Sequence, residues 1–243
     1  MIDIHCHILP DFDDGASDLD EALEMAEMAV NSGVTDIIAT PHFRGEIAFL
    51  DNVPMIERRF QTLVLAIDKA SIPLRLHLGA EVLCLPSTAR MAASHQLPTL
   101  AGTDYTLIEF YFNESFSFMD DMLAKIADSG YKPVVAHPER YNAIQRDPEV
   151  LHRWADQGYV LQLNTGSILG ELGFRAEQTA NEILSMGFAH LFASDGHHSY
   201  TRTPHMGAIR HWANEFCDPG YAAALLKVNP GCILRNESLP DTL

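Results

Sequence analysis

The sequence predicts an α/β fold in which seven parallel strands form a closed or nearly closed ring, and three observations lead to this prediction. Amphipathic segments alternate with short apolar ones, and a glycine stands at the joints, as at helix ends that precede parallel strands. Polar residues stand at the ends of the predicted strands. Only a ring brings all those ends to one point, where barrel enzymes carry their sites. The length of 243 residues suits a single domain over residues 1–243 better than two small domains.

The first predicted strand carries ligand-type side chains on one face. Apolar and polar residues alternate over residues 2–7, so His5 and His7 project to the same side. Burying these polar groups without partners is costly, and a bound metal ion would satisfy them. The opposite, apolar face is expected to hold Ile2, Ile4 and Cys6, and the loop that follows supplies Asp11, Asp13 and Asp14 before Gly15.

The first helix has recognisable limits. Ser17 or Asp18 can cap its start, with Asp20 or Glu21 completing a capping box. Gly33 is placed to end it in the left-handed conformation.

Prolines and glycines mark the later elements. Pro54 is expected to open the second helix and Pro204 the last long one. No glycine fingerprint for a dinucleotide or nucleotide follows the first strand, which argues against a doubly wound nucleotide-binding sheet. Further helices are expected over residues 116–129, 148–157 and 176–186, and strands over 36–40, 74–81, 106–110, 132–137, 159–164 and 190–194.

Composition excludes several classes of protein. The 16 basic and 33 acidic residues give a formal charge of −17, which disfavours a nucleic-acid surface and therefore an exonuclease. None of the four cysteines forms a C-x-x-C pair, so neither a zinc–thiolate site nor a disulfide framework is expected. The sequence shows no leader segment and no run long enough to cross a membrane, so we expect a cytoplasmic protein without direct membrane insertion.

Nine side chains at or near the strand ends form a candidate metal centre. A lone histidine at a strand end is more often structural, but His5-x-His7 before an acidic loop favours a metal, and Asp195-x-His197 repeats the spacing. One ion takes about four to six ligands, so five imidazoles and four carboxylates suit two or three ions, with Glu81 as a bridge. The candidate ligands are His5, His7, Asp14, His42, Glu81, Glu109, His137, Asp195 and His197.

A second motif suggests thiolate chemistry but lacks the required loop. Cys84 and Arg90 match the C-x5-R signature of thiolate phosphatases. That chemistry needs a glycine-rich loop of backbone N–H donors, whereas this stretch has no glycine and Pro86 removes one donor. We therefore expect Cys84 to be a packing residue. Asn164 is expected to lie behind the ligands, and His77 shares a predicted strand face with Glu81.

The motifs in combination resemble those of a known superfamily. They are Asp3-Ile-His-Cys-His-Ile-Leu-Pro10, Asp13-Asp-Gly15, Thr40-Pro-His42, Gly79-Ala-Glu81, Ile108-Glu-Phe110, Ala136-His-Pro-Glu-Arg-Tyr141 and Ala193-Ser-Asp-Gly-His197. They resemble the PHP (polymerase and histidinol phosphatase) superfamily, and more narrowly its bacterial tyrosine-protein phosphatase branch, the CpsB/YwqE family. The clearest departure is Gly196, where a larger residue such as alanine or methionine is usual.

The resemblance implies a distorted seven-stranded (β/α) TIM-like barrel, the PHP fold, with two to three divalent ions. Manganese is the expected metal, with iron, zinc and magnesium as alternatives. The resemblance assigns His5, His7, Glu81 and Asp195 to one ion, Glu81, Glu109 and His137 to the second, and Asp14, His42 and His197 to the third.

The resemblance also implies a metal-dependent phosphomonoester hydrolase, a protein-tyrosine phosphatase. Its partner would be the phosphotyrosine tail of a membrane-associated tyrosine kinase that controls capsule or exopolysaccharide synthesis. We expect a metal-bridging hydroxide to attack phosphorus in line, without a phosphoenzyme. Arg140 is expected to clamp the phosphate, Arg202 is a second clamp, and His205 or a water molecule would protonate the leaving oxygen.

Three other functions compete with this one. Histidinol phosphate or another small phosphoester would use the same site with different outer loops. An exonuclease is disfavoured by the charge. A non-catalytic interaction module would have lost ligands, yet all nine positions are filled.

Overall fold

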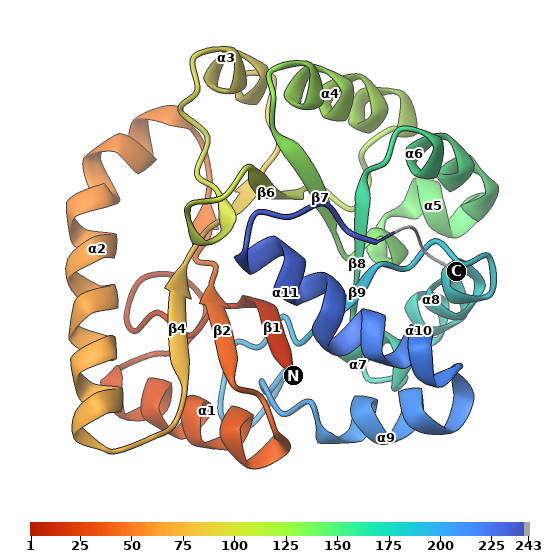
Figure 1. Cartoon of the computed structure of the whole chain (residues 1–243). Helices are drawn as coiled ribbons and strands as arrows, with labels where there is room; N and C mark the ends of the chain where they lie inside the picture. Colours follow the sequence, from red (N-terminus) through yellow and green to blue (C-terminus); the bar gives the residue numbers. More distant parts are fainter. Residues whose placement is uncertain (241–243) are drawn as a thin grey trace.

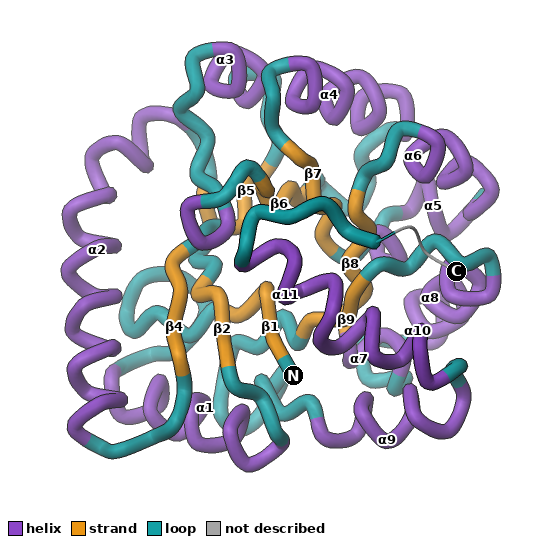
Figure 2. Tube along the Cα trace, in the orientation of Figure 1, coloured by secondary structure: helices purple, strands orange, loops and turns teal. Residues whose placement is uncertain are grey.

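Parallel strands lie in the interior of the molecule, with helices around them (Figures 1 and 2). The structure, a computed structural model, describes residues 1–240, and for residues 46–51 the backbone alone. The strands are β1 (Ile2–Cys6), β2 (Asp36–Ala39), β3 (His42–Phe43), β4 (Arg75–Leu78), β5 (Glu81–Leu83), β6 (Tyr105–Glu109), β7 (Lys132–Ala136), β8 (Val160–Asn164) and β9 (Leu191–Ala193).

The helices differ widely in length. They are α1 (Leu19–Ser32), α2 (Glu46–Lys69), α3 (Thr88–Ala93), α4 (Phe116–Asp128), α5 (Asn142–Arg146), α6 (His152–Asp156), α7 (Thr165–Ile168), α8 (Phe174–Ser185), α9 (Gly207–Phe216), α10 (Pro219–Ala223) and α11 (Asn229–Leu234), with the turns η1 (Leu100–Gly102), η2 (Pro138–Arg140) and η3 (Pro148–Leu151) and the π-helix η4 (Ala224–Val228). Among the described residues, none of these helices is both long and apolar enough to span a membrane.

The strands form two parallel sheets, so the α/β class is confirmed, whereas a closed ring of seven strands is not formed. One sheet has the order β1-β2-β4 and the other β3-β5-β6-β7-β8-β9. The division falls at Thr40-Pro41, between β2 and β3, and at Gly79-Ala80, between β4 and β5. Pro41 has no N–H to donate to a neighbouring strand. A side chain at Gly79 would approach Ile38 to 2.8 Å, so glycine permits the close packing there.

The first strand nevertheless meets the last one at the ends that carry the polar residues. The N–H of Asp195 donates to the carbonyl of His5 at 2.9 Å, and the N–H of His7 donates to the carbonyl of Gly196 at 2.8 Å. Between them, Cys6 and Gly196 form an isolated parallel bridge. These contacts place the beginning and the last quarter of the chain side by side at the site.

An apolar cluster fills the space that the strands enclose. It includes residues from β1, β2, β6, β7, β8 and β9, and Ile233 of α11 completes it. The predicted alternation along β1 is only partly correct, because the pairing register shifts between Asp3 and Cys6. Ile4 therefore joins this inner cluster, whereas Cys6 packs in the larger cluster between strands and helices.

The predicted start of α1 is confirmed and that of α2 is wrong. Asp18 caps α1 by accepting from the N–H of Glu21, and Gly33 ends the helix at φ 96°. The Glu21 carboxylate accepts from the N–H of Ser17, one residue before the cap. By contrast, α2 begins at Glu46 and contains Pro54 in its interior, since a helix of 24 residues tolerates the loss of one N–H donor.

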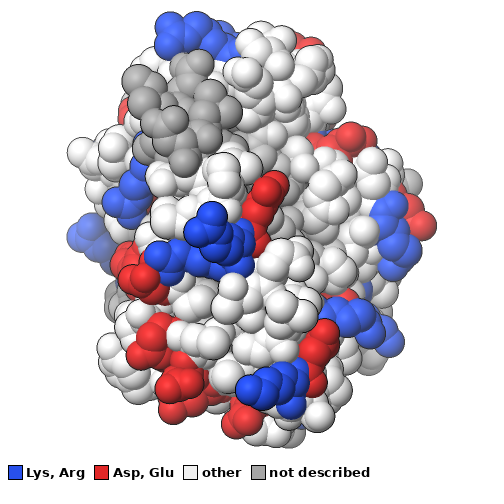
Figure 3. All heavy atoms as spheres, turned by 90° about the vertical axis from the view of Figure 1, so that its left-hand side faces the viewer, with Lys and Arg blue, Asp and Glu red and all other residues white. Residues whose placement is uncertain are grey.

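The later helices mostly follow the predictions. Residues 116–129 and 176–186 correspond to α4 and α8 with small differences at their ends, and residues 148–157 are divided into η3 and α6. Pro204 lies three residues before α9 and does not open it, and α10, η4 and α11 follow that helix. On the face that carries α2, basic side chains lie next to acidic ones rather than in one large basic patch (Figure 3).

Candidate metal centre

Glu81 lies at the middle of the candidate site and is 1% exposed. Its Oε1 atom is 3.0 Å from Nε2 of His137 and 3.3 Å from Nε2 of His5. Its Oε2 atom is 3.3 Å from Nε2 of His7 and 3.1 Å from Nδ1 of His42. These histidines lie at the carboxyl ends of β1 and β7 and at the start of β3, just after β2, so these elements converge on one carboxylate. Such a carboxylate is placed to bridge two cations.

Asp195 follows β9 and faces the same imidazoles from the other side. Its Oδ1 atom is 3.4 Å from Nε2 of His5, 3.6 Å from Nε2 of His7 and 3.5 Å from Nδ1 of His197. Asp195 has φ 50° and His137 has φ 35°, conformations that are uncommon for residues other than glycine. Backbone strain of this kind clusters at functional sites, where surrounding contacts stabilise it.

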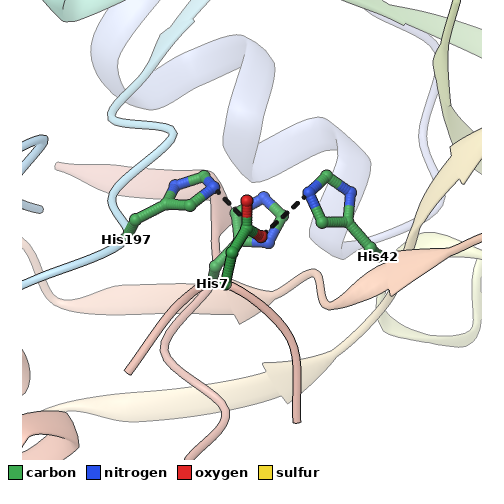
Figure 4. A group of neighbouring side chains, drawn as sticks. His7, His42 and His197 are labelled. Carbon is green, nitrogen blue, oxygen red and sulfur yellow. Dashed lines mark ion pairs between the residues drawn. The ribbon is translucent and has the colours of Figure 1, made fainter. Parts of the chain in front are cut away.

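The acidic loop after β1 supplies the most exposed member of the cluster. The Oδ1 atom of Asp14 is 3.1 Å from Nε2 of His42 and 3.7 Å from Nε2 of His197. Figure 4 shows His7, His42 and His197 around one carboxylate, with ion pairs from it to His42 and His197. Glu109 lies on the other side of His42, with 3.8 Å between Oε2 and Nδ1.

The structure thus brings all nine candidate ligands into one cluster. Within it, three groups place one ligand atom per residue within 4.8 Å of one another. His7, His42 and Glu81 each belong to two of the groups, so neighbouring ions would have ligand residues in common. The groups are His7, Asp14, His42 and His197; His5, His7 and Glu81; and His42, Glu81 and Glu109.

Unpaired buried atoms indicate that the cluster fits cations. Nδ1 of His42 and Oε2 of Glu81 are both buried and lack a hydrogen-bond partner, although they lie 3.1 Å apart. Buried polar atoms in native proteins are almost always paired. A shared divalent cation would satisfy both atoms, and imidazole with carboxylate is a donor set that suits manganese, iron or zinc.

In the metal-free protein, burial and the neighbouring carboxylates have opposite effects on the pKa values of His5 and His7. Burial lowers the pKa of His5, but Glu81 and Asp195 outweigh it and raise that pKa to about 9. Burial also lowers the pKa of His7, yet contacts with Asp13 and Glu81 hold it well above the usual value. Burial and the neighbouring His7 lower the pKa of His197 to about 3. Without a cation, the centre therefore keeps protons on His5 and His7 to balance its carboxylates.

We expect divalent metal binding to release protons from these imidazoles. Because the pKa of His5 is about 9, its ring is protonated at neutral pH and must lose that proton to bind a metal. Metal affinity should therefore rise with pH up to that pKa, by about tenfold per pH unit for each proton displaced. Isothermal titration of Mn²⁺ in buffers with different ionisation enthalpies measures the protons released. An affinity independent of pH between neutrality and the pKa of His5 would contradict this expectation.

A set of hydrogen bonds orients the candidate ligands from outside the cluster. Asp13 accepts from Nδ1 of His7 at 2.9 Å and from the N–H of His42 at 2.8 Å. Gln162 lies 2.9 Å from Nδ1 of His5. The sequence reading missed both roles, although Gln162 precedes Asn164 by two residues and therefore shares its strand face.

The expected place of Asn164 behind the ligands is confirmed. Its amide nitrogen donates to Oδ2 of Asp195 at 2.7 Å, and its oxygen accepts from Gln162 at 2.8 Å. Its backbone N–H donates to the buried carboxylate of Glu139. The Glu139 carboxylate is buried and also accepts from the Ser167 hydroxyl, and the ion pairs described for residues 1–240 join Arg140 to Asp195 instead.

Two of the three predicted catalytic side chains lie at the centre. Arg202 donates to Oδ2 of Asp195 at 2.6 Å, and Arg140 donates to the same oxygen at 3.4 Å. The Arg140 guanidinium also lies 4.5 Å from the centroid of the Phe112 ring. His205 is exposed and its ring lies against Gly207 at the start of α9; none of the contacts described for residues 1–240 joins it to the centre.

The sequence is similar to a family model and to proteins named as tyrosine-protein phosphatases. Residues 1–235 match the family model described as capsular polysaccharide synthesis, CpsB/CapC. Tyrosine-protein phosphatase YwqE of Bacillus subtilis is 33% identical over 240 residues, which cover 98% of this chain and 93% of that protein. Tyrosine-protein phosphatase CpsB of Streptococcus agalactiae serotype V is 32% identical over 209 residues, or 84% of this chain and 86% of the relative.

Solved structures extend the comparison to the fold. A chain from the crystal structures of YwqE from Bacillus subtilis and CpsB from Streptococcus pneumoniae, described as metal-dependent tyrosine phosphatases, matches with a TM-score of 0.87 and 32% identity. The match covers 100% of this chain and 99% of that one. A mutant organophosphorus hydrolase from Deinococcus radiodurans matches with a TM-score of 0.59 and 10% identity, over 96% of this chain and 91% of the other, and so shares the fold alone.

Proposed function

Because this chain belongs to the CpsB/CapC family of capsular polysaccharide synthesis, we propose that it is a metal-dependent protein-tyrosine phosphatase. The observation that carries the proposal is the cluster around Glu81, in which imidazoles and carboxylates face one another with two ligand atoms left unpaired. The resident cofactor would be two to three divalent ions, with manganese as the first choice and iron, zinc or magnesium as alternatives. The relatives that match along most of their length are named as tyrosine-protein phosphatases.

The predicted ligand assignment forms part of the proposal. His5, His7 and Asp195 would hold one ion and Asp14, His42 and His197 another, while Glu81 would bridge to a third position beside Glu109 and His137. When bound, such ions lower the pKa of a coordinated water and neutralise charge on a phosphoryl group. Asp13, Gln162 and Asn164 would keep the ligand atoms in place through the hydrogen bonds described above.

The two arginines would hold the phosphate group against the centre. Arg140 and Arg202 both donate to the outer oxygen of Asp195, which leaves further N–H groups of each guanidinium available. A guanidinium fork suits two phosphate oxygens at once. Phe112 stacks on Arg140 and restrains its direction. The protein itself therefore orients the substrate and offsets the charge that the reaction develops.

The leaving group lowers the demand for a side-chain acid. A phenolate is a better leaving group than an alkoxide because its conjugate acid has a pKa near 10. This is consistent with the exposed position of His205, for which we now propose no direct part in the reaction. The partner would be the phosphotyrosine tail of a membrane-associated tyrosine kinase of capsule or exopolysaccharide synthesis. Turnover of a phosphotyrosine peptide should exceed turnover of histidinol phosphate, and the reverse result would favour the small-molecule alternative.

Chelation and thiol alkylation should have opposite effects on activity. We expect EDTA to abolish hydrolysis of a phosphotyrosine peptide and added Mn²⁺ to restore it, because the nucleophile depends on the ions. Iodoacetamide should leave the rate unchanged: burial raises the pKa of Cys84 to about 12, so its thiol is protonated and unreactive. Inactivation by iodoacetamide, with activity that persists in EDTA, would contradict the metal-dependent proposal and return Cys84 to consideration.

A further inference from the structure

We propose that a cavity beside the metal centre, walled by Phe12, Phe43 and Ile56, holds the phenyl ring of the phosphotyrosine side chain. This inference rests on the function proposed above and adds the residues that would select an aryl ester. The cavity has a volume of about 340 Å³. Its walls come from the loop after β1, from β3 and the residue after it, and from α2. Besides the three apolar residues, the lining is polar and includes two members of the nine-residue cluster; the polar residues are Asp13, Asp14, His42, Arg44 and Asn52.

The three most exposed members of the nine-residue cluster are neighbours. The exposed fractions of the side chains are 62% for Asp14, 16% for Glu109 and 11% for His42. The six other members of the cluster are exposed by 4% or less. A substrate can therefore approach the candidate ligands from the side on which Asp14, His42 and Glu109 lie.

The cavity adjoins that open side directly. Asp14 and His42 line it, and they are also ligand candidates. A phosphate held by the centre directs its ester oxygen, and the group attached to it, away from the buried ligands. The attached group then lies in the space between Asp14, His42 and the apolar wall.

The apolar wall suits a flat hydrocarbon ring. Phe43 is 2% exposed and Ile56 is 5% exposed, so both form a fixed floor and Phe12 offers more of the apolar surface that a ring can contact. Phe12 is half-buried in the loop between Asp11 and Asp13 and presents a ring at the cavity. Aromatic pairs contribute about 0.5–1.5 kcal/mol beyond the burial of their area. An alkyl phosphoester would gain little from the same wall, so the cavity would favour tyrosine over serine or small alkyl esters.

Two phosphonates that cannot be hydrolysed isolate the contribution of the ring. Phenylphosphonate and methylphosphonate share the anionic group that binds the centre and differ only in the attached group. In the Mn²⁺-loaded protein, isothermal titration should give a Kd for phenylphosphonate about tenfold below that for methylphosphonate. In Phe12→Ala this ratio should fall to about twofold while the Kd of methylphosphonate stays unchanged, and Phe12→Leu should lie between the two.

Two further variants control for general effects of removing an aromatic ring. Phe174 is 76% exposed on α8 and lies outside the cavity, so Phe174→Ala should keep the wild-type ratio. Phe112 supports Arg140, so Phe112→Ala should weaken both phosphonates equally and also keep the ratio. An unchanged ratio in Phe12→Ala, or a ratio lost in Phe112→Ala instead, would overturn the assignment of the cavity. If neither phosphonate binds the metal-loaded protein, the proposed phosphatase function itself fails, and the ring site fails with it.

Discussion

Glu81→Gln is expected to lower kcat/KM for a phosphotyrosine peptide by about a thousandfold or more, since ion binding and phosphoryl charge neutralisation supply several kcal/mol. The amide has nearly the shape of the carboxylate but no charge. Glu81 lies within 3.3 Å of four imidazole nitrogens, so its negative charge is close to four of the other candidate ligands. Metal content measured by elemental analysis should fall together with the rate.

The same substitution should change the titration of the metal-free protein. Glu81 is the foremost group that raises the pKa of His5 against the effect of burial. Without that carboxylate, the pKa of His5 should fall from about 9 towards or below the usual histidine value, with only Asp195 left to raise it. NMR titration of the imidazole resonances in the chelated protein measures this shift.

A surface glutamate provides the matched control. Glu149 is 72% exposed and pairs with His152 on the surface, so Glu149→Gln should keep full metal content, rate and His5 titration. If Glu81→Gln retained its metal but lost activity, Glu81 would act on the substrate and not as a ligand. If it retained both, the centre would not depend on this carboxylate.

Gly15→Ala is expected to destabilise the protein and to empty the centre. A Cβ atom at Gly15 would lie 2.0 Å from the carbonyl oxygen of His7 and 2.6 Å from its Cβ atom. Neither neighbour can rotate away, because both belong to or adjoin the backbone of a candidate ligand. The loop that carries Asp13 and Asp14 must then move. Overpacking usually costs about 1–3 kcal/mol, and we expect the upper end of this range.

Urea unfolding and metal titration of Gly15→Ala test this expectation together. A useful control is Gly166→Ala, because the nearest atom to its added Cβ, at 3.2 Å, is a carboxylate oxygen at the far end of the Glu171 side chain. That side chain can move, so the control should lose little stability and no metal. Wild-type stability and metal affinity in Gly15→Ala would show that the acidic loop is not held by the close contact between Gly15 and His7.

The candidate ligands could be predicted from the sequence because strand ends are marked by local patterns. His5 and His7 alternate with apolar residues, and Asp195 and His197 repeat that spacing after another apolar segment. Whatever the number of sheets, the carboxyl ends of parallel strands gather at one edge. The candidate ligands therefore meet even though the strands form two sheets and not one closed ring.

The contacts that orient the ligands were harder to predict because they depend on register. Gln162 contacts His5 across 157 residues of sequence, and no local pattern signals which strands are neighbours. The shift in register between Asp3 and Cys6 likewise moved Ile4 to the inner cluster, against the simple alternation. The predicted start of α2 at Pro54 was wrong for a different reason. Proline is favoured at the first position of a helix, but a long helix such as α2 can contain a proline in its interior.

The pairing of the first strand with the segment after β9 has a consequence for biosynthesis. His5 and His7 form backbone hydrogen bonds with Asp195 and Gly196, residues that are synthesised about 190 positions later. At a synthesis rate of roughly 5–20 residues per second, the backbone groups of β1 that pair with residues 195 and 196 would remain unpaired for on the order of 10–40 s. During this interval a nascent chain has the first histidines but not the aspartate that completes their surroundings. We therefore expect a product that stops before residue 195 to bind Mn²⁺ more weakly than the whole chain, because it lacks Asp195 and His197.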